Sequence, residues 1–257
     1  MPEVSKVMRF PKEVKAEISE IKDGIYRISG FVEEYGITFN QFLIDDEKPT
    51  LIHTGPVGMY GQVEAKVREV IPIERLSHVA FCHFESDEWG GMEFLRSPNT
   101  KLLCSQLSSQ LNLMGWYNVP SDHLSFWENE TLNTGKRTLR FIMTPHVHHW
   151  DSMMVFEEST KSLFPSDLFI QPGNNKPVSS DDMSEAMIGL YRAIGIFASE
   201  TPVRHTVKRL ARLEPQMVFP MHGSCIDGSM FTKYADALMK NEFAYSGMLL
   251  GKKLEVG

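Results

Sequence analysis

The stretch His83-Phe84-Glu85-Ser86-Asp87-Glu88-Trp89 carries the residues from which the fold and the chemistry of this chain can be inferred. It offers one imidazole and three carboxylates within six residues. The compact apolar run before it, 77–83, predicts a strand, and a helix is expected near 90–95. Side chains at such a strand end can converge on one point, so the stretch is a candidate metal site. The alternative is a polar loop whose acidic residue caps the helix.

Three further predicted strands end in histidine or carboxylate groups. Open α/β sheets place their chemistry at strand ends, so four such ends in one chain predict a shared site. For any one of these histidines a structural role is the better interpretation, whereas for the whole set metal binding is favoured. The three ends are Thr144-Pro145-His146-Val147-His148-His149 after strand 139–144, Pro165-Ser166-Asp167 after strand 162–164, and His222-Gly223-Ser224 after strand 216–221.

Short β-branched and aromatic runs alternate with amphipathic stretches along the sequence. Hairpin-like strands come first, strand–helix alternation follows, and the mixture recurs in the second half. This order predicts an α/β fold of two sheets packed face to face with helices outside, an αββα sandwich, as one domain over residues 1–257. The expected strands are 24–30, 37–44, 49–55, 77–83, 102–104, 139–144, 153–157, 162–164 and 216–222, and the expected helices are 57–70, 90–95, 181–198, 202–212 and 229–241.

Composition excludes several classes of function. The chain has 257 residues, 42% of them hydrophobic, and a net charge of −7 without a basic block, so neither nucleic acid nor an anionic membrane is an expected partner. The sequence shows no secretory signal and no apolar run of membrane-spanning length. Cys82, Cys104 and Cys225 form no C-x-x-C pair, which argues against a disulfide framework, a zinc ribbon and a rubredoxin-type centre. We therefore expect a cytoplasmic protein.

The order of the candidate ligands resembles that of the metallo-β-lactamase superfamily. Flavodiiron proteins and related oxygen-binding di-iron proteins have H-x-E-x-D-H where the zinc hydrolases of that superfamily have H-x-H-x-D-H, and His83, Glu85 and Asp87 match the former. The segment 148–153 resembles the family's H-W-P-D-S-M, which selects His148, and Asp167 follows at the family's spacing. Residues 220–223 match the final P-x-H-G, which contains His222. The resemblance covers nearly the whole chain.

The resemblance implies a centre of two iron ions that change between Fe2+ and Fe3+, with bridging oxo, hydroxo or peroxo species. By resemblance, His83, Glu85 and His148 hold one iron, Asp87 and His222 hold the other, and Asp167 bridges the two. Three carboxylates beside three imidazoles suit iron better than zinc. The main alternative is a zinc-dependent hydrolase in which metal-bound hydroxide attacks an ester, thioester or phosphodiester. A weakly metallated docking scaffold is a third interpretation.

The sequence departs from the family's ligand pattern at several positions. Glu88 stands where the motif has His, and we expect it to bind the second iron rather than to point away. Four carboxylates, with Glu88 among them, would carry −4 and balance two ferrous ions. His53 replaces the Asp of the superfamily's L-I-D-T-G, and it either hydrogen-bonds a ligand or is an ordinary buried histidine. His146 could line the pocket, whereas His149 is expected to face away from it.

The sequence shows no flavodoxin segment after the metal domain, and we expect that this chain binds no FMN. Reduction of dioxygen to water takes four electrons, and two ferrous ions supply two. We therefore expect an oxygen or redox sensor, or a slow oxidoreductase that depends on an external reductase, acting on dioxygen, nitric oxide or peroxide. Standalone domains of this type resemble sensory modules of bacterial signalling, including chemotaxis. By resemblance, the protein is expected to form a homodimer.

Overall fold

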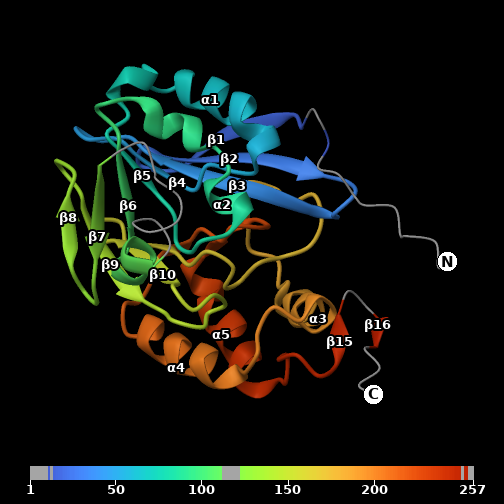
Figure 1. Cartoon of the computed structure of the whole chain (residues 1–257). Helices are drawn as coiled ribbons and strands as arrows, with labels where there is room; N and C mark the ends of the chain where they lie inside the picture. The colour runs from blue at the N-terminus through green and yellow to red at the C-terminus, as the bar shows by residue number, and fades with distance from the viewer. Residues whose placement is uncertain (1–10, 12–13, 112–121, 250–251, 254–257) are drawn as a thin grey trace.

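The computed structural model describes residues 11, 14–111, 122–249 and 252–253. Two seven-stranded sheets pack against each other, with α1 outside the first sheet and α3, α4 and α5 outside the second (Figure 1). This arrangement confirms the predicted αββα sandwich. Within the described residues, none of the helices combines the length and the apolar character needed to cross a lipid bilayer.

The first sheet follows chain order from β1 to β7. Its first four strands pair antiparallel, and β4 to β7 pair parallel, so the carboxyl ends of these last strands share one edge. The strands are β1 (Ala16–Lys22), β2 (Ile25–Val32), β3 (Ile37–Ile44), β4 (Thr50–Ile52), β5 (His78–Ala80), β6 (Lys101–Ser105) and β7 (His123–Phe126).

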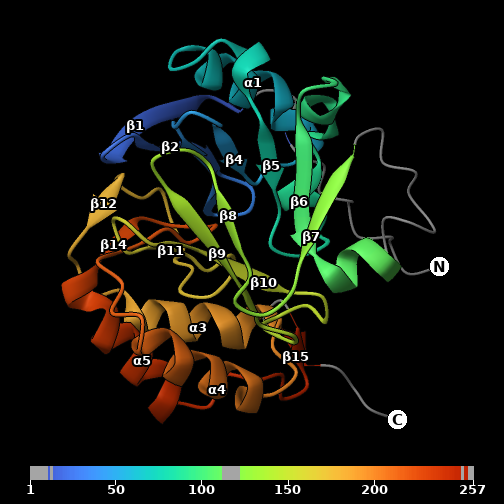
Figure 2. The same cartoon turned by 90° about the vertical axis from the view of Figure 1, so that its left-hand side faces the viewer.

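The second sheet has the order β12-β14-β13-β11-β10-β9-β8, which Figure 2 shows from the side. β11 runs parallel to β13, and β9 runs in the same direction as β11 because each pairs antiparallel with β10. The strands are β8 (Thr131–Asn133), β9 (Thr138–Met143), β10 (Met153–Glu157), β11 (Ser162–Phe164), β12 (Val178–Ser179), β13 (Met217–Val218) and β14 (Cys225–Asp227).

The helices cover the outer faces of the sheets through apolar residues at helical spacing. In α1, Val63 and Val67 lie one turn apart and are buried, whereas α4 begins at the cap Ser199, whose hydroxyl accepts the N–H of Thr201. The helices are α1 (Tyr60–Arg68), α2 (Ser86–Trp89), α3 (Ser184–Ile194), α4 (Glu200–Ala211) and α5 (Phe231–Lys240); short 3-10 turns cover Val57–Met59, Ile73–Arg75, Met92–Arg96 and Gly228–Met230, and a small hairpin joins β15 (Met248–Leu249) to β16 (Lys252–Lys253).

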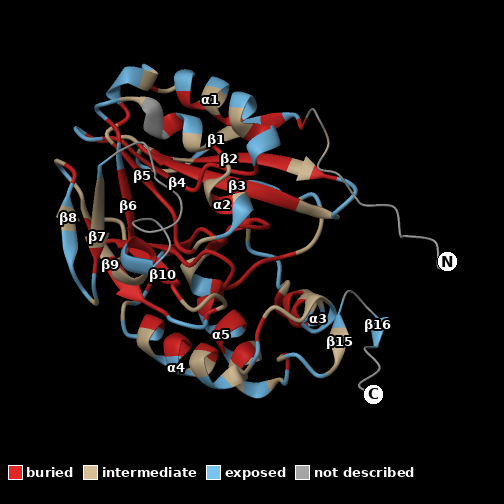
Figure 3. Cartoon of the chain, in the orientation of Figure 1, coloured by how far each residue is buried: buried red, intermediate tan, exposed pale blue. Residues whose placement is uncertain are grey.

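Strand alternation divides the core into three apolar layers. Figure 3 shows how buried residues run through both sheets and the inner sides of the helices. In β3, Phe42 and Ile44 face the other sheet, whereas Leu43 packs under α1. Phe42 meets Phe164 of the second sheet with ring centroids 5.5 Å apart, and Phe164 stacks on Phe219 at 4.7 Å. Because both faces of each central strand are buried, these strands read as nearly continuous apolar runs.

The predicted elements match the observed ones closely, with differences where the chain approaches the sheet edge. Strands 153–157 and 162–164 are found with the expected bounds, and helix 57–70 is a 3-10 turn followed by α1. Two strands are shorter than expected: 77–83 is found as β5 (His78–Ala80), and 216–222 is found as β13 (Met217–Val218). In both, the chain leaves the sheet before it reaches the candidate ligand. The edge strands β1, β7, β8 and β12 and the strand β14 were not predicted.

The buried His78 in β5 should make folding stability depend on pH. Burial, with a smaller contribution from the charges of Lys48 and Lys101, lowers its pKa from the ordinary value of 6.5 to about 4. The folded state thus favours the neutral imidazole, so this contribution to stability is present above pH 6.5 and is lost as the pH falls towards 4.

A His78→Gln variant should lose less stability than the wild type between pH 6.5 and pH 4, by about 1 kcal/mol after allowance for solvent screening. Gln keeps a polar group near the Thr50 hydroxyl, which lies 3.3 Å from His78 Nδ1, but it does not titrate. Urea unfolding at four pH values across this window measures the difference. Parallel pH profiles of the two proteins would contradict the assignment.

Candidate metal centre

Four strand ends bring the candidate ligands to one edge of the sandwich. His83 follows β5 and Glu85 directly precedes the short helix α2, whereas His148, Asp167 and His222 follow β9, β11 and β13. These strands point the same way within their sheets, so their carboxyl ends meet where the sheets face each other (Figure 1). The groups that the sequence analysis collected from distant segments therefore lie together.

The backbone around this edge holds unusual conformations. His53, His146 and Ser166 have φ angles of 63°, 65° and 54°, in the left-handed region that non-glycine residues rarely occupy. Such residues persist only where the surrounding structure determines them, and they concentrate at functional sites.

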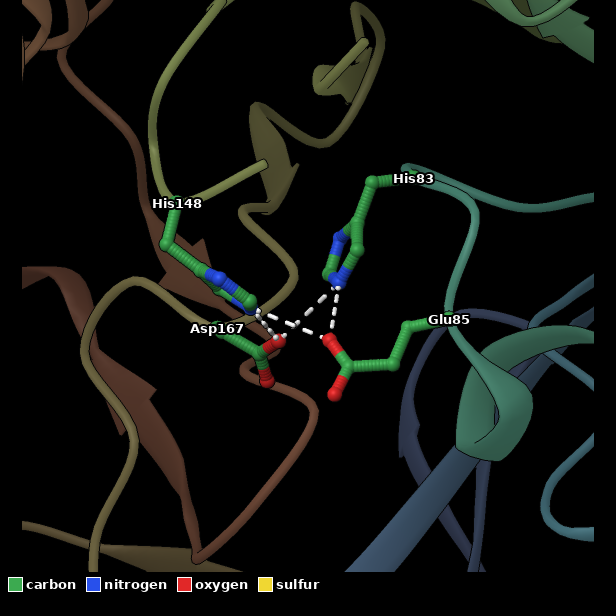
Figure 4. A group of neighbouring side chains, drawn as sticks. All are labelled: His83, Glu85, His148 and Asp167. Atoms are coloured by element: carbon green, nitrogen blue, oxygen red, sulfur yellow. Dashed lines mark hydrogen bonds and ion pairs between the residues drawn. The ribbon is translucent and has the colours of Figure 1, made fainter. Parts of the chain in front are cut away.

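Four side chains form a first donor group, which Figure 4 shows. His83 Nε2 lies 2.9 Å from Glu85 Oε2, and His148 Nε2 lies 3.2 Å from the same oxygen. Asp167 Oδ2 is 3.4 Å from His83 Nε2 and 3.1 Å from His148 Nε2. One ligand atom from each residue falls within 4.8 Å of the others, a spacing suited to a single metal ion.

A second donor group shares Asp167 through its other oxygen. Asp167 Oδ1 lies 3.4 Å from His222 Nε2, which in turn lies 3.5 Å from Asp87 Oδ2. This Oδ1 is buried, and its 3.4 Å contact with His222 Nε2 is longer than an ordinary hydrogen bond. A buried carboxylate oxygen with so weak a donor fits a cation, since burial of such a group is otherwise costly. The donor chemistry therefore fits two metal ions with Asp167 between them.

Hydrogen bonds fix which nitrogen of each imidazole faces the centre. His222 Nδ1 donates to the carbonyl of Thr38 at 2.7 Å, and its ring packs edge-on against Phe39. His83 Nδ1 lies 3.1 Å from Ser166 Oγ and 3.2 Å from Glu88 Oε1. Both rings therefore present Nε2 to the donor groups, and the groups behind them hold that tautomer.

Glu88 does not lie with the other expected ligands. Its Oε2 accepts the backbone N–H groups of Cys82 at 2.9 Å and His83 at 2.8 Å, and the Ser166 hydroxyl donates to its Oε1. Neighbouring helical residues point about 100° apart, so when Asp87 faces His222 the next side chain turns back behind His83. The arrangement thus differs from our expectation that Glu88 binds the second metal.

His53 reaches the same buried carboxylate from the opposite side. Its Nε2 lies 3.2 Å from Glu88 Oε1, and its Nδ1 lies 3.0 Å from Met221 Sδ. His53 therefore contacts Glu88, the carboxylate that lies behind His83. Burial lowers the pKa of His53 to about 3, so its ring is neutral near pH 7.

The two histidines beside His148 lie outside the donor groups. His149 Nδ1 pairs with the carboxylate of Asp151. His146 is exposed and lines a separate hollow of about 640 Å³ on the α4 side of His148. The position next to a ligand in sequence is therefore not enough to place a histidine in the site.

The charged groups of the centre stabilise one another in the metal-free protein. Burial lowers the pKa of His148 and His222, but hydrogen bonds to Asp167 outweigh burial and raise each to about 10. Burial also lowers the pKa of His83, but the carboxylates of Glu88, Glu85 and Asp167 together raise it to about 9. Hydrogen bonds from His148 and His83 lower the pKa of Glu85 to about 2. Near pH 7 the centre is a network of imidazolium and carboxylate ions.

A hollow of about 600 Å³ opens beside the centre. Glu85 and Asp87 form part of its wall, together with the apolar side chains of Phe39, Trp89 and Val57. Glu85 is the most exposed of the donor side chains, at 45%. A small molecule can therefore approach the centre from this side.

Two residues that support the site escaped the sequence analysis. Ser166 contacts both His83 and Glu88, and Thr38 accepts from His222 through its carbonyl and from the Gly223 N–H through its hydroxyl. The serine directly before Asp167 was a usable signal for the first. A backbone carbonyl in β3 carries no sequence signal for the second.

Comparisons with known proteins agree with this geometry. Residues 37–223 match the family described as "ODP family beta lactamase". The chain is 27% identical over 207 residues to the rubredoxin-oxygen oxidoreductase of Megalodesulfovibrio gigas, covering 76% of this chain and 50% of that protein. It is 26% identical over 165 residues to the nitric oxide reductase of Moorella thermoacetica, covering 59% and 41%. The chain spans about half the length of the curated relatives it matches.

Solved structures show the same fold at low identity. The rubredoxin oxygen:oxidoreductase from Desulfovibrio gigas superposes with a TM-score of 0.75 at 22% identity, covering 87% of this chain and 61% of that one. The flavodiiron protein from Giardia intestinalis gives a TM-score of 0.74 at 20% identity, covering 90% and 60%.

Metal binding to this centre should release protons. A bound imidazole must give up its proton, and His83, His148 and His222 all have pKa values of about 9 or 10 in the metal-free protein. Filling the centre at pH 7 should therefore release about three protons per chain, and affinity should rise with pH up to about 9 to 10. Calorimetric titration with Zn2+ in buffers of different ionisation enthalpy counts these protons. A release near zero would show that the histidines are neutral before binding.

Glu88 should influence metal binding through His83. A Glu88→Gln variant keeps an oxygen for the two backbone N–H groups but loses the charge behind the imidazole, so we expect about 10- to 100-fold weaker metal binding. In a His83→Ala background the same change should have little further effect, whereas in a His222→Ala background it should have its full effect. Competition titrations with Co2+ measure the wild type, the three single variants and the two double variants. The opposite pattern would mean that Glu88 binds the second metal directly.

Proposed function

Because this chain belongs to the ODP family of the beta-lactamase fold, we propose that it is a non-haem di-iron protein that binds dioxygen and reacts with it. The observation that carries the proposal is the shared carboxylate Asp167, which faces two donor groups with its two oxygens. Nitric oxide and peroxide are small enough to reach the same centre through the apolar hollow.

Six side chains would hold the metal ions. His83, Glu85 and His148 surround the first position, Asp87 and His222 the second, and Asp167 both. Three carboxylates offer hard oxygen donors beside three imidazoles, and mixed sets of this kind suit non-haem iron better than the nitrogen-rich sets of zinc enzymes. When bound in the ferrous state, the two irons supply two electrons to an oxygen species.

The protein's own residues prepare the centre for that chemistry. Glu88 and Ser166 orient His83, and the Thr38 carbonyl orients His222, so the ligand atoms need little reorganisation. Glu85 and Asp87 border the apolar hollow, which places the arriving molecule at the carboxylate side of the centre. The apolar walls limit the water that reaches it.

Reduction beyond two electrons requires a donor outside the described residues. The cysteines Cys82, Cys104 and Cys225 are all buried and unpaired, and no pair of them forms a redox-active disulfide. We propose that further electrons come from another domain or a separate reductase. If none is available, the centre reacts once and acts as a sensor of oxygen. Sensing and slow reduction are thus two uses of one chemistry.

Anaerobic reconstitution with ferrous iron, followed by a measured pulse of oxygen, tests the proposal. Two irons per chain and a new near-ultraviolet or visible absorption band support it. A band that persists indicates sensing, whereas rapid cycling with an added reductant indicates a reductase. Binding of zinc alone, with no response to oxygen, would contradict the proposal and favour a metal-dependent hydrolase.

The two donor groups should respond differently to single substitutions. Asp167→Ala removes the shared ligand, so we expect less than one iron per chain, whereas His222→Ala should leave about one. Glu93→Ala, a change of an exposed carboxylate just after α2, is the matched control and should keep two. Iron analysis after gel filtration, with circular dichroism to check folding, measures the series. Equal loss of iron in the Asp167 and His222 variants would contradict separate positions that share Asp167.

A further inference from the structure

We propose that a second pocket, built on the buried Arg27, binds a small oxyanion. The pocket lies between the β1–β2 hairpin and the segment 174–177 that leads into β12, at the side of the sandwich where β1 and β12 approach each other (Figure 2). It is lined by different residues from the metal centre and from the hollow beside it.

Arg27 has no charge partner in the described part of the chain. Its side chain is 4% exposed, and its Nη2 donates to the carbonyl of Gly223 at 3.0 Å. Its Nε is buried and donates to no described residue. Buried charges in proteins are normally paired, because the desolvation of an isolated charge is unfavourable. Ordered water can accept from Nε but cannot neutralise the charge.

The neighbouring groups do not supply that charge. Burial raises the pKa of the Cys225 thiol to about 12, so it is neutral near pH 7. Glu17 lines the pocket, but its side chain is 77% exposed and pairs with Lys15 at 3.6 Å. The pocket therefore keeps a net positive charge from Arg27.

Beside the apolar Phe31 and Pro177, the lining offers several hydrogen-bond donors. Ser19 lies directly opposite Arg27 in the β1–β2 ladder and Ser29 opposite Glu17, so these side chains share one face of the hairpin. Lys15 and Asn174 contribute an ammonium and an amide at the rim. A guanidinium fork with hydroxyl and amide donors matches phosphate, sulfate or a short carboxylate.

The size of the pocket limits the ligand. Its volume is about 250 Å³, whereas a water molecule occupies about 30 Å³ of liquid. Inorganic phosphate or a small carboxylic acid fits with some water, and a nucleotide does not. The Gly223 carbonyl that Arg27 holds also accepts from Asn40 Nδ2 at 2.9 Å, and Gly223 follows the candidate ligand His222. An occupied pocket would thus stabilise the loop that carries His222.

Binding of inorganic phosphate to the full chain tests the proposal. Calorimetric titration and thermal unfolding are measured with phosphate and with sodium chloride at equal ionic strength. We expect saturable binding of phosphate, a rise in Tm that chloride does not reproduce, and at least tenfold weaker binding by Arg27→Met. Arg68→Met, which removes an exposed arginine of α1, is the matched control and should bind phosphate as the wild type does.

A Ser19→Asp variant keeps the test decisive if Arg27→Met does not fold. It places a carboxylate across the ladder from Arg27, where it should occupy the role of the anion. We expect a higher Tm without phosphate and loss of phosphate binding. The proposal is overturned if phosphate and chloride act alike on the wild type, or if Ser19→Asp binds phosphate unchanged.

Discussion

The centre depends on one buried carboxylate, Asp167, whose two oxygens face two sets of donors. Burial alone would favour its neutral form, but hydrogen bonds from His148 and His222 hold its pKa well below the ordinary range. That charge is tolerable only because β5, β9 and β13 deliver the imidazoles of His83, His148 and His222 to the edge where β11 places Asp167. Asp167 can therefore stay ionised and face both donor groups because the order of the strands brings the imidazoles to this buried edge of the sandwich.

Glu88 extends this constraint behind the ligands. It sits 3.2 Å from both His83 Nδ1 and His53 Nε2, fully buried, with two backbone N–H groups bound to one oxygen. A carboxylate at this position can change the electrostatic potential at the metal centre without binding a metal. Burial raises the pKa of Glu88 to about 7. In its ionised form its negative charge favours a more positive centre, since charges in such a desolvated site interact strongly. Glu88 can therefore offset part of the metal charge without binding a metal, because it lies directly behind the ligand His83.

Much of the fold could be predicted from sequence, because buried strands such as β10 and β11 are apolar runs bounded by turns. Edge strands could not: β8 is largely exposed, and Ala16–Lys22 alternates with charged residues, so neither gives an apolar signal. For the centre, strand-end positions and the family's spacing selected the six residues that converge. Glu88 was expected among them because it stands where the family's motif has His, and the sequence carries no information on the rotation of α2 that turns this side chain behind His83. Arg27 was not selected at all, since a single arginine in a strand reveals its burial only in three dimensions.

X-ray absorption spectroscopy of the iron-loaded protein tests the central claim most directly. Two metals that share Asp167 should lie about 3.5 to 4 Å apart, as in other two-metal sites, and give an iron–iron scattering contribution at that distance. This contribution should disappear in an Asp167→Ala variant. An iron-loaded wild type with only nitrogen and oxygen neighbours, and no metal–metal contribution, would contradict the account.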